Sequence, residues 1–76
     1  MEKALKTIIE SIVSEPSQVS INEVEGERAI VYEVKVAETD MGKVIGKEGR
    51  IAKAIRTVMK AVAAKENKRV TIEFIG

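Results

Sequence analysis

The chain has 76 residues with one proline and no low-complexity run, a length that accommodates one domain but not two separate cores. It contains no cysteine and no histidine, which excludes disulfides, thiol nucleophiles and the usual zinc sites and removes the commonest general base at neutral pH. The net charge of +1 by itself indicates nothing about partners.

No apolar stretch reaches the roughly 18 residues of a membrane span, and charges interrupt the apolar run at the start of the chain, unlike in a signal peptide. We therefore expect a cytoplasmic protein without membrane contact. A domain of this length buries only about 60% of its unfolded surface, so its stability should be marginal unless ideal packing or a partner chain helps. Self-association is expected on these grounds.

Residues 2–14 are predicted to form an amphipathic helix that Pro16 ends near Ser14 or Glu15. Its apolar side chains recur at helical spacing at Leu5, Ile8, Ile9 and Ile12. A short strand follows through Val19, Ile21 and Val24, and residues 25–27 supply a turn. Residues 29–36 are the clearest strand, because apolar side chains occupy one phase at Ile30, Tyr32, Val34 and Val36.

Asp40 is predicted to cap a short helix over residues 41–45 that ends at Gly46, and Gly49 opens a second helix that runs to about Ala64. Around this second helix, apolar residues through Met59 fill a sector of roughly 200°, which is wider than one sheet can cover. The remaining arc holds Thr57 and four basic residues: Arg50, Lys53, Arg56 and Lys60. Residues 69–75 alternate between apolar and polar side chains, the pattern of a half-buried strand.

The predicted order is helix, strand, strand, helix, helix, strand, which indicates an α+β fold. The second and third strands flank a helical crossover and should lie parallel, while the first two strands form an antiparallel hairpin. A three-stranded mixed sheet with the helices on one face follows.

Charge is distributed unevenly along the chain. Residues 1–40 hold four basic and nine acidic side chains, whereas residues 41–69 hold nine basic and two acidic ones. The second segment could be the footprint of a phosphate backbone, although a solvated basic face is the commoner outcome for basic helices. Its basic residues are Lys43, Lys47, Arg50, Lys53, Arg56, Lys60, Lys65, Lys68 and Arg69.

Two glycines, Gly46 and Gly49, bracket Lys47 and Glu48 between the two predicted helices. Glycines without Cβ atoms let the backbone approach a phosphate closely and expose amide N–H groups at the start of the second helix, where the helix dipole favours an anion. The alternative is that each glycine only caps a helix, a use found in many domains.

The stretch Val-Ile-Gly-Lys-Glu-Gly-Arg at residues 44–50 is similar to the signature of KH domains. The element order resembles the type II form of that fold along all 76 residues, and the chain length and the pattern of residues 42–50 most resemble the bacterial single-domain KH proteins called KhpA. The resemblance implies a single KH domain over residues 1–76 whose loop clamps about four nucleotides of single-stranded RNA beside an apolar groove.

Carried onto this sequence, the resemblance assigns the RNA clamp to Gly46, Lys47, Glu48 and Gly49. Lys43, Arg50 and Lys53 would face phosphates, while Val44, Ile45 and Ile51 would form the groove floor or the core beneath it. Glu48 departs from the most favourable chemistry, because an acidic side chain repels phosphates and lowers the expected affinity. The resemblance also implies a KhpB-like protein partner and an RNA-chaperone role in cell-wall and cell-shape homeostasis.

Other function classes fit less well. A nucleotide-binding P-loop fails on spacing, because three residues separate Gly42 from the Gly46-Lys47 pair and Glu48 stands where a hydroxyl is needed. No paired carboxylates indicate an active site, so we expect no enzyme, no cofactor, no metal and no small-molecule substrate.

The two aromatic residues, Tyr32 and Phe74, are too few for RNA binding across a surface of stacking rings. The alternative function is a protein–protein adaptor or a homodimerisation module with secondary RNA contact. Its partner surface would be the sheet edge or the flank of the second helix around Met59.

Overall fold

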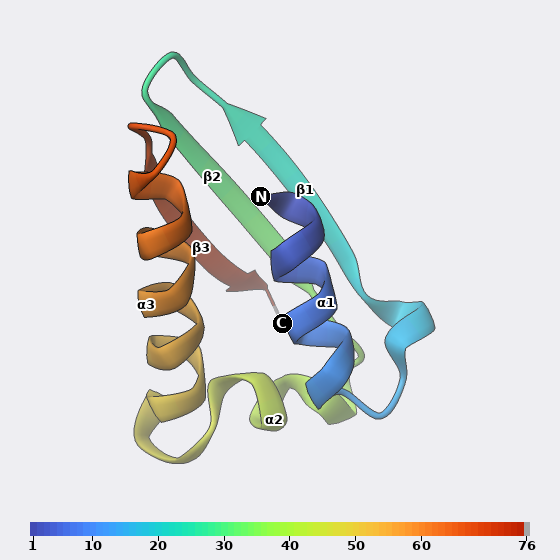
Figure 1. Cartoon of the computed structure of the whole chain (residues 1–76). Helices are drawn as coiled ribbons and strands as arrows, with labels where there is room; N and C mark the ends of the chain where they lie inside the picture. Colours follow the sequence, from blue (N-terminus) through green and yellow to red (C-terminus); the bar gives the residue numbers. More distant parts are fainter. Residues whose placement is uncertain (76) are drawn as a thin grey trace.

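Three helices cover one face of a three-stranded sheet in the computed structural model (Figure 1). The structure describes residues 1–75, so Gly76, the last residue of the predicted domain, lies outside the described residues. The helices and strands are α1 (Glu2–Ile12), β1 (Ser20–Glu25), β2 (Ala29–Lys35), α2 (Met41–Ile45), α3 (Arg50–Ala64) and β3 (Arg69–Ile75). The predicted α+β fold and element order are confirmed. Three single 3-10 turns were not predicted: η1 (Pro16–Gln18), η2 (Glu38–Asp40) and η3 (Lys47–Gly49).

The sheet has the order β1-β2-β3, with β2 in the centre. β1 pairs antiparallel with β2, and β2 pairs parallel with β3, with Tyr32 opposite Ile72. The predicted mixed sheet is therefore confirmed. Because β3 has a strand neighbour on one side only, its other edge is open along α3.

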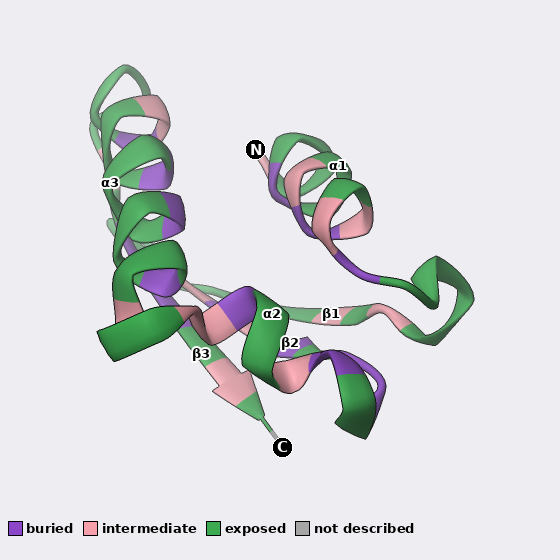
Figure 2. Cartoon of the chain, turned by 90° about the horizontal axis from the view of Figure 1, so that it is seen from below, coloured by how far each residue is buried: buried purple, intermediate pink, exposed green. Residues whose placement is uncertain are grey.

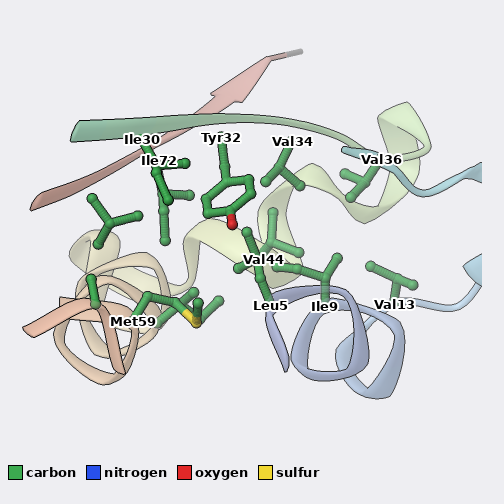
Figure 3. Packing of buried hydrophobic residues seen from close by; sticks show 13 residues of the cluster. Leu5, Ile9, Val13, Ile30, Tyr32, Val34, Val36, Val44, Met59 and Ile72 are labelled. Atoms are coloured by element: carbon green, nitrogen blue, oxygen red, sulfur yellow. The ribbon is translucent and has the colours of Figure 1, made fainter. Parts of the chain in front are cut away.

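The core lies between the sheet and the helices (Figure 3). The strand phase predicted for residues 29–36 is confirmed, because Ile30, Tyr32, Val34 and Val36 are all buried. Leu5 and Ile9 from α1 and Met59 from α3 meet them from the helical layer. The Tyr32 hydroxyl is buried without a hydrogen-bond partner among the described residues, and this burial raises the pKa of Tyr32.

The first helix is shorter than predicted. α1 ends at Ile12, two residues before Ser14, because Val13 already has extended backbone angles of φ −81° and ψ 157°. Pro16 opens the following turn η1 and does not itself stop the helix. The predicted end of the helix near Ser14 or Glu15 was therefore wrong by less than one turn. The predicted cause was also wrong, because Pro16 does not end the helix.

The apolar sector of α3 is divided between core and solvent (Figure 2). Its buried members are Ala52, Ile55, Met59 and Ala63. Ile51 and Val58 retain 39% and 50% of their accessible surface, which agrees with the expectation that the sector is wider than one sheet can cover. The basic arc is exposed as predicted, at Arg50, Lys53, Arg56 and Lys60.

Asp40 has a different role from the predicted helix cap. Its side chain makes no capping hydrogen bond to α2 and is fully buried. The two carboxylate oxygens instead accept hydrogen bonds from the backbone amides of Ser14 at 2.9 Å and Glu15 at 3.0 Å. The Lys43 ammonium lies 3.6 Å from the same carboxylate and donates to the Ser14 hydroxyl. Asp40 therefore ties the segment after α1 to the start of α2.

These contacts stabilise the ionised form of Asp40. The hydrogen bond from the Ser14 amide, with smaller contributions from the Glu15 amide and the Lys43 ammonium, lowers the pKa of the Asp40 carboxyl from its ordinary value of 3.8. Burial acts in the opposite direction and is outweighed. The folded state therefore binds a proton at Asp40 less readily than the unfolded state does.

Replacing Asp40 with Asn should lower the free energy of unfolding at neutral pH. The NH2 group of Asn is a donor, so one of the two backbone N–H groups would lose its acceptor. The contribution of Asp40 to stability is complete above the unfolded pKa of 3.8 and is lost as the pH falls through the lowered folded value. Asp40→Asn should therefore flatten the loss of stability between about pH 5 and pH 2. Urea unfolding of both proteins across this range measures the effect.

The matched control is Glu38→Gln, which neutralises an exposed carboxylate in the same turn η2. It should change neither the stability at neutral pH nor the acid dependence appreciably. An acid dependence that is the same in Asp40→Asn and in the unsubstituted protein would contradict the assigned role of Asp40.

Candidate nucleic-acid interface

The loop between α2 and α3 has an unusual backbone. Gly46 adopts φ 75° and ψ 175°, Glu48 adopts φ 57° and ψ 25°, and Gly49 adopts φ 74° and ψ 14°. The region occupied by Gly46 is essentially restricted to glycine, and that of Gly49 is the left-handed region that glycine enters without cost. Glu48 reaches the left-handed region with a full side chain, which costs free energy that the surrounding structure must supply.

Gly46 also allows a close backbone contact. A Cβ atom at this position would lie 2.3 Å from Cγ1 and 2.9 Å from the backbone nitrogen of Ile51. A Cβ atom at Gly49 would meet nothing within 4 Å. The loop therefore folds back against the first turn of α3 at Gly46, whereas Gly49 faces open space.

The turn η3 leaves its first two backbone amides without a partner inside the turn. The N–H of Gly46 donates to the Gly42 carbonyl at 2.9 Å, the N–H of Gly49 donates to the Gly46 carbonyl at 3.2 Å, and the N–H of Arg50 donates to the Lys47 carbonyl. Lys47 and Glu48 are the first two residues of the turn η3, so their amides have no partner within that turn, and both residues are exposed. Neighbouring free amides of this kind can bind an anion.

Cationic side chains surround these amides. Lys47 is exposed in the loop itself, and Lys53 is exposed one turn into α3. The Arg50 guanidinium lies 3.5 Å from the Glu48 carboxylate, and both side chains are largely exposed. An exposed pair of this kind contributes little to stability, so a phosphate oxygen can replace Glu48 as the partner of Arg50. Arg50 and Lys53 are three residues apart on α3 and share one of its faces, and Lys47 is exposed in the loop that precedes them.

Lys43 lies in a different setting from the other predicted phosphate-facing residues. Its ammonium pairs with Asp40 and donates to the Ser14 hydroxyl, although half of the side chain remains exposed. The three predicted apolar residues are also separated by the fold. Val44 is fully buried in the core, Ile45 is half-buried against it, and Ile51 is exposed.

A shallow groove runs between α3 and the open edge of β3, and the sequence did not reveal it. Its walls are formed by Arg56, Lys60, Val70, Thr71 and Ile72, and it continues past Lys68 and Arg69. From the sequence, Arg56 and Lys60 could belong either to a row of phosphate contacts or to a solvated basic face. Sequence patterns could not decide between these roles, because they do not show which edge of the sheet is open. The excess of basic residues in 41–69 was the one signal that pointed to this groove.

Arg56 is anchored inside this groove. Its Nε–H donates to the Ile72 carbonyl at 3.2 Å, on the open edge of β3. The guanidinium carbon lies 5.5 Å from the centre of the Phe74 ring, within the range of a cation–π contact. Lys53, Arg56 and Lys60 follow one another at spacings of three and four residues, so they lie on one face of α3 and lead from the loop into the groove.

No three acidic side chains within residues 1–75 gather where they could hold a metal ion. No helix in that part of the chain has the length and apolarity to cross a membrane. The exposed basic side chains of the loop and of the groove suit the binding of an extended anion.

Comparison with known proteins agrees with this geometry. The family model described as "KhpA/KhpB, KH domain" matches residues 2–74. The chain is 61% identical to the RNA-binding protein KhpA of Clostridium acetobutylicum over 75 residues, covering 99% of this chain and 100% of the relative. With the same coverage, it is 57% identical to the RNA-binding protein KhpA of Clostridium perfringens and 55% identical to that of Caldanaerobacter subterraneus subsp. tengcongensis.

The two loop glycines should respond differently to substitution. Gly46→Ala forces a Cβ atom into Ile51 and into a backbone region that only glycine occupies, so we expect a loss of about 3 kcal/mol or more in the free energy of unfolding. Gly49→Ala meets no atom and should cost only about 1–2 kcal/mol for its left-handed backbone. Urea unfolding of the two variants measures the difference.

Gly42→Ala is the control for this pair. Gly42 lies within α2, has open space at its Cβ position, and should gain about 0.5–1 kcal/mol from the better helix propensity of alanine. Equal losses for Gly46→Ala and Gly49→Ala would show that the contact with Ile51 does not constrain the loop.

Proposed function

Because the chain belongs to the KhpA/KhpB family of KH domains, we propose that it acts as a single KH domain that holds single-stranded RNA through residues 46–49. The chain is a binding protein and not an enzyme. The observation that supports the loop assignment is the exposed pair Lys47 and Glu48, whose amides open the turn η3 and have no partner within it.

In the proposed complex, a phosphate oxygen accepts hydrogen bonds from the Lys47 and Glu48 amides. The absence of Cβ atoms at Gly46 and Gly49 lets the sugar–phosphate chain approach the backbone. Lys47 and Arg50 supply positive charge at this phosphate, and Arg50 exchanges Glu48 for it. Lys53 contacts the next part of the RNA backbone.

The remaining predicted site residues have graded roles in this proposal. Ile45 and Ile51 form the apolar surface beside the clamp, while Val44 supports the loop from within the core. Lys43 contacts RNA only after leaving Asp40 and Ser14, so its main contribution is to the position of α2. The bases then lie along the groove between α3 and β3.

The wider biological role rests on family membership. The description of the family joins KhpA with KhpB, and we propose a KhpB-like protein as a partner of this chain. We extend the proposal to an RNA-chaperone role in cell-wall and cell-shape homeostasis, as the resemblance to KhpA implies. Cellular RNA as the ligand makes the cytoplasm the compartment we propose.

Binding that depends on phosphate contacts should weaken as salt increases. Lys47→Gln should lower the affinity for a short single-stranded RNA and reduce the slope of log K against log salt by about 0.7, the value for one lost contact on a single strand. Arg50→Gln should change the slope less, because Arg50 exchanges one anion for another. Fluorescence anisotropy at several salt concentrations measures both effects.

Lys3→Gln is the matched control, since it removes the same charge from an exposed position near the start of α1. It should leave the salt dependence unchanged. If the loop only connects two helices, the loop variants will change stability without changing RNA affinity, and the proposal will fail.

A second function is favoured by an apolar stripe along α3. Ile51 and Val58 are 39% and 50% exposed, and the exposed residues Ala54 and Ala61 lie between and beyond them at helical spacing. Met59 is fully buried in the core, so the partner surface first expected around Met59 moves to this stripe. Small and apolar residues in such a row suit the packing of a helix from a second chain, either another copy or a KhpB-like partner.

Val58→Lys places a charge in the middle of this stripe without entering the core. If the chain forms a dimer through α3, this substitution should halve the solution mass measured by light scattering, because burying an unpaired ammonium is costly. Thr57→Lys adds the same charge on the polar arc and should leave the mass unchanged. A dimer that survives Val58→Lys would exclude the stripe as its interface.

A further inference from the structure

We propose that Arg56 and Phe74 form a platform on which one nucleobase of the bound RNA stacks, in the groove between α3 and β3. This inference rests on the proposed function, because it assumes that single-stranded RNA reaches the groove. It adds a specific stacking position to a binding mode in which phosphate contacts supply most of the attraction and the bases lie along the groove.

Recognition of single-stranded RNA commonly uses bases stacked on aromatic rings or on the flat guanidinium of arginine. Of the two aromatic residues in the chain, Tyr32 is fully buried beneath the helices and cannot meet a base. Phe74 is half-buried at the open edge of β3, and Arg56 lies over its ring. The exposed flat group at this place is therefore the guanidinium of Arg56.

The Arg56 side chain is held in place before RNA arrives. Its Nε–H is fixed by the Ile72 carbonyl at 3.2 Å, and its guanidinium carbon lies 5.5 Å from the centre of the Phe74 ring. An arginine anchored at two points loses less conformational freedom on binding than a free surface arginine does. Lysine cannot reproduce this arrangement, because its ammonium has neither a plane nor an Nε–H donor.

The position of Arg56 also fits a strand that starts at the loop. Arg56 lies six residues after Arg50 on α3, which places it about 9 Å further along the helix axis. Lys60, Lys68 and Arg69 line the same groove and can hold the phosphates on either side of a stacked base. A basic groove with one stacking position differs from a sheet covered by several rings, which the composition of this chain excludes.

The test compares two short labelled strands of equal length, one ordinary single-stranded RNA and one that carries the same ribose-phosphate chain without bases. Arg56→Lys preserves the charge but removes the plane. It should weaken binding of the ordinary RNA at least about fivefold, the lower limit for one lost stacked base, and leave binding of the abasic strand unchanged. Phe74→Leu, which removes the ring beneath Arg56, should give a smaller loss of the same kind.

Lys3→Arg, a change between the same two residue types at an exposed position of α1 outside the groove, is the control and should not alter the preference for the strand with bases. If Arg56→Lys weakens both strands equally, Arg56 is a phosphate contact or a structural residue, and the platform is disproved. The same conclusion follows if Arg56→Lys weakens neither strand, or if the unsubstituted protein binds both strands equally. If the unsubstituted protein binds neither strand, the proposed RNA-binding function fails together with the platform.

Discussion

The contact between the Gly46 backbone and Ile51 is the constraint on which the candidate site depends. It turns the chain sharply at the end of α2, in a backbone conformation that only glycine adopts. The two residues that follow then lie between this turn and the second glycine, and their amides have no partner within the turn η3. The availability of these amides thus follows from the way α2 and α3 are joined and requires no particular side chain at the two positions.

The short helix α2 holds this junction in place although it is too short to be stable alone. An isolated helix needs more than about 12 residues in water, whereas α2 has five. Three contacts replace the missing length: Asp40 ties its start to the chain after α1, Val44 near its end is buried in the core, and Gly46 packs against α3 where the helix ends. Buried contacts far from the loop therefore determine the geometry of the loop.

The sequence allowed the elements to be predicted because their periodicities are local. The alternation through residues 29–36 identified the central strand and its buried side chains, and the limits of α2 and β3 followed from their patterns. The role of Asp40 could not be predicted, since its acceptor atoms meet amides 25 and 26 residues away. The exposure of Val58 likewise depends on how α3 is placed over the sheet, which helical spacing does not specify.

The candidate site itself was predicted unevenly for the same reason. The residues of the loop are contiguous and form a motif, so Gly46, Lys47, Glu48 and Gly49 could be named from the sequence. The groove is formed by two segments that meet only because β3 lies at the edge of the sheet, and no local pattern shows this. Arg56 gains its specific setting from Ile72 and Phe74, both contributed by the last strand.

The distribution of ion pairs limits how strongly this surface can attract RNA. Each of the three salt bridges among the described residues uses a cation from the basic segment: Lys43 with Asp40, Arg50 with Glu48, and Lys68 with Glu25. When RNA replaces one of these carboxylates, the cation changes partner and releases no counterion of its own, so the exchange adds little electrostatic free energy. The effective positive charge is therefore smaller than the count of basic residues indicates. The lysines without such partners, in the loop and along α3, must therefore supply most of the electrostatic attraction. Contacts with the bases then contribute a larger share of the binding free energy.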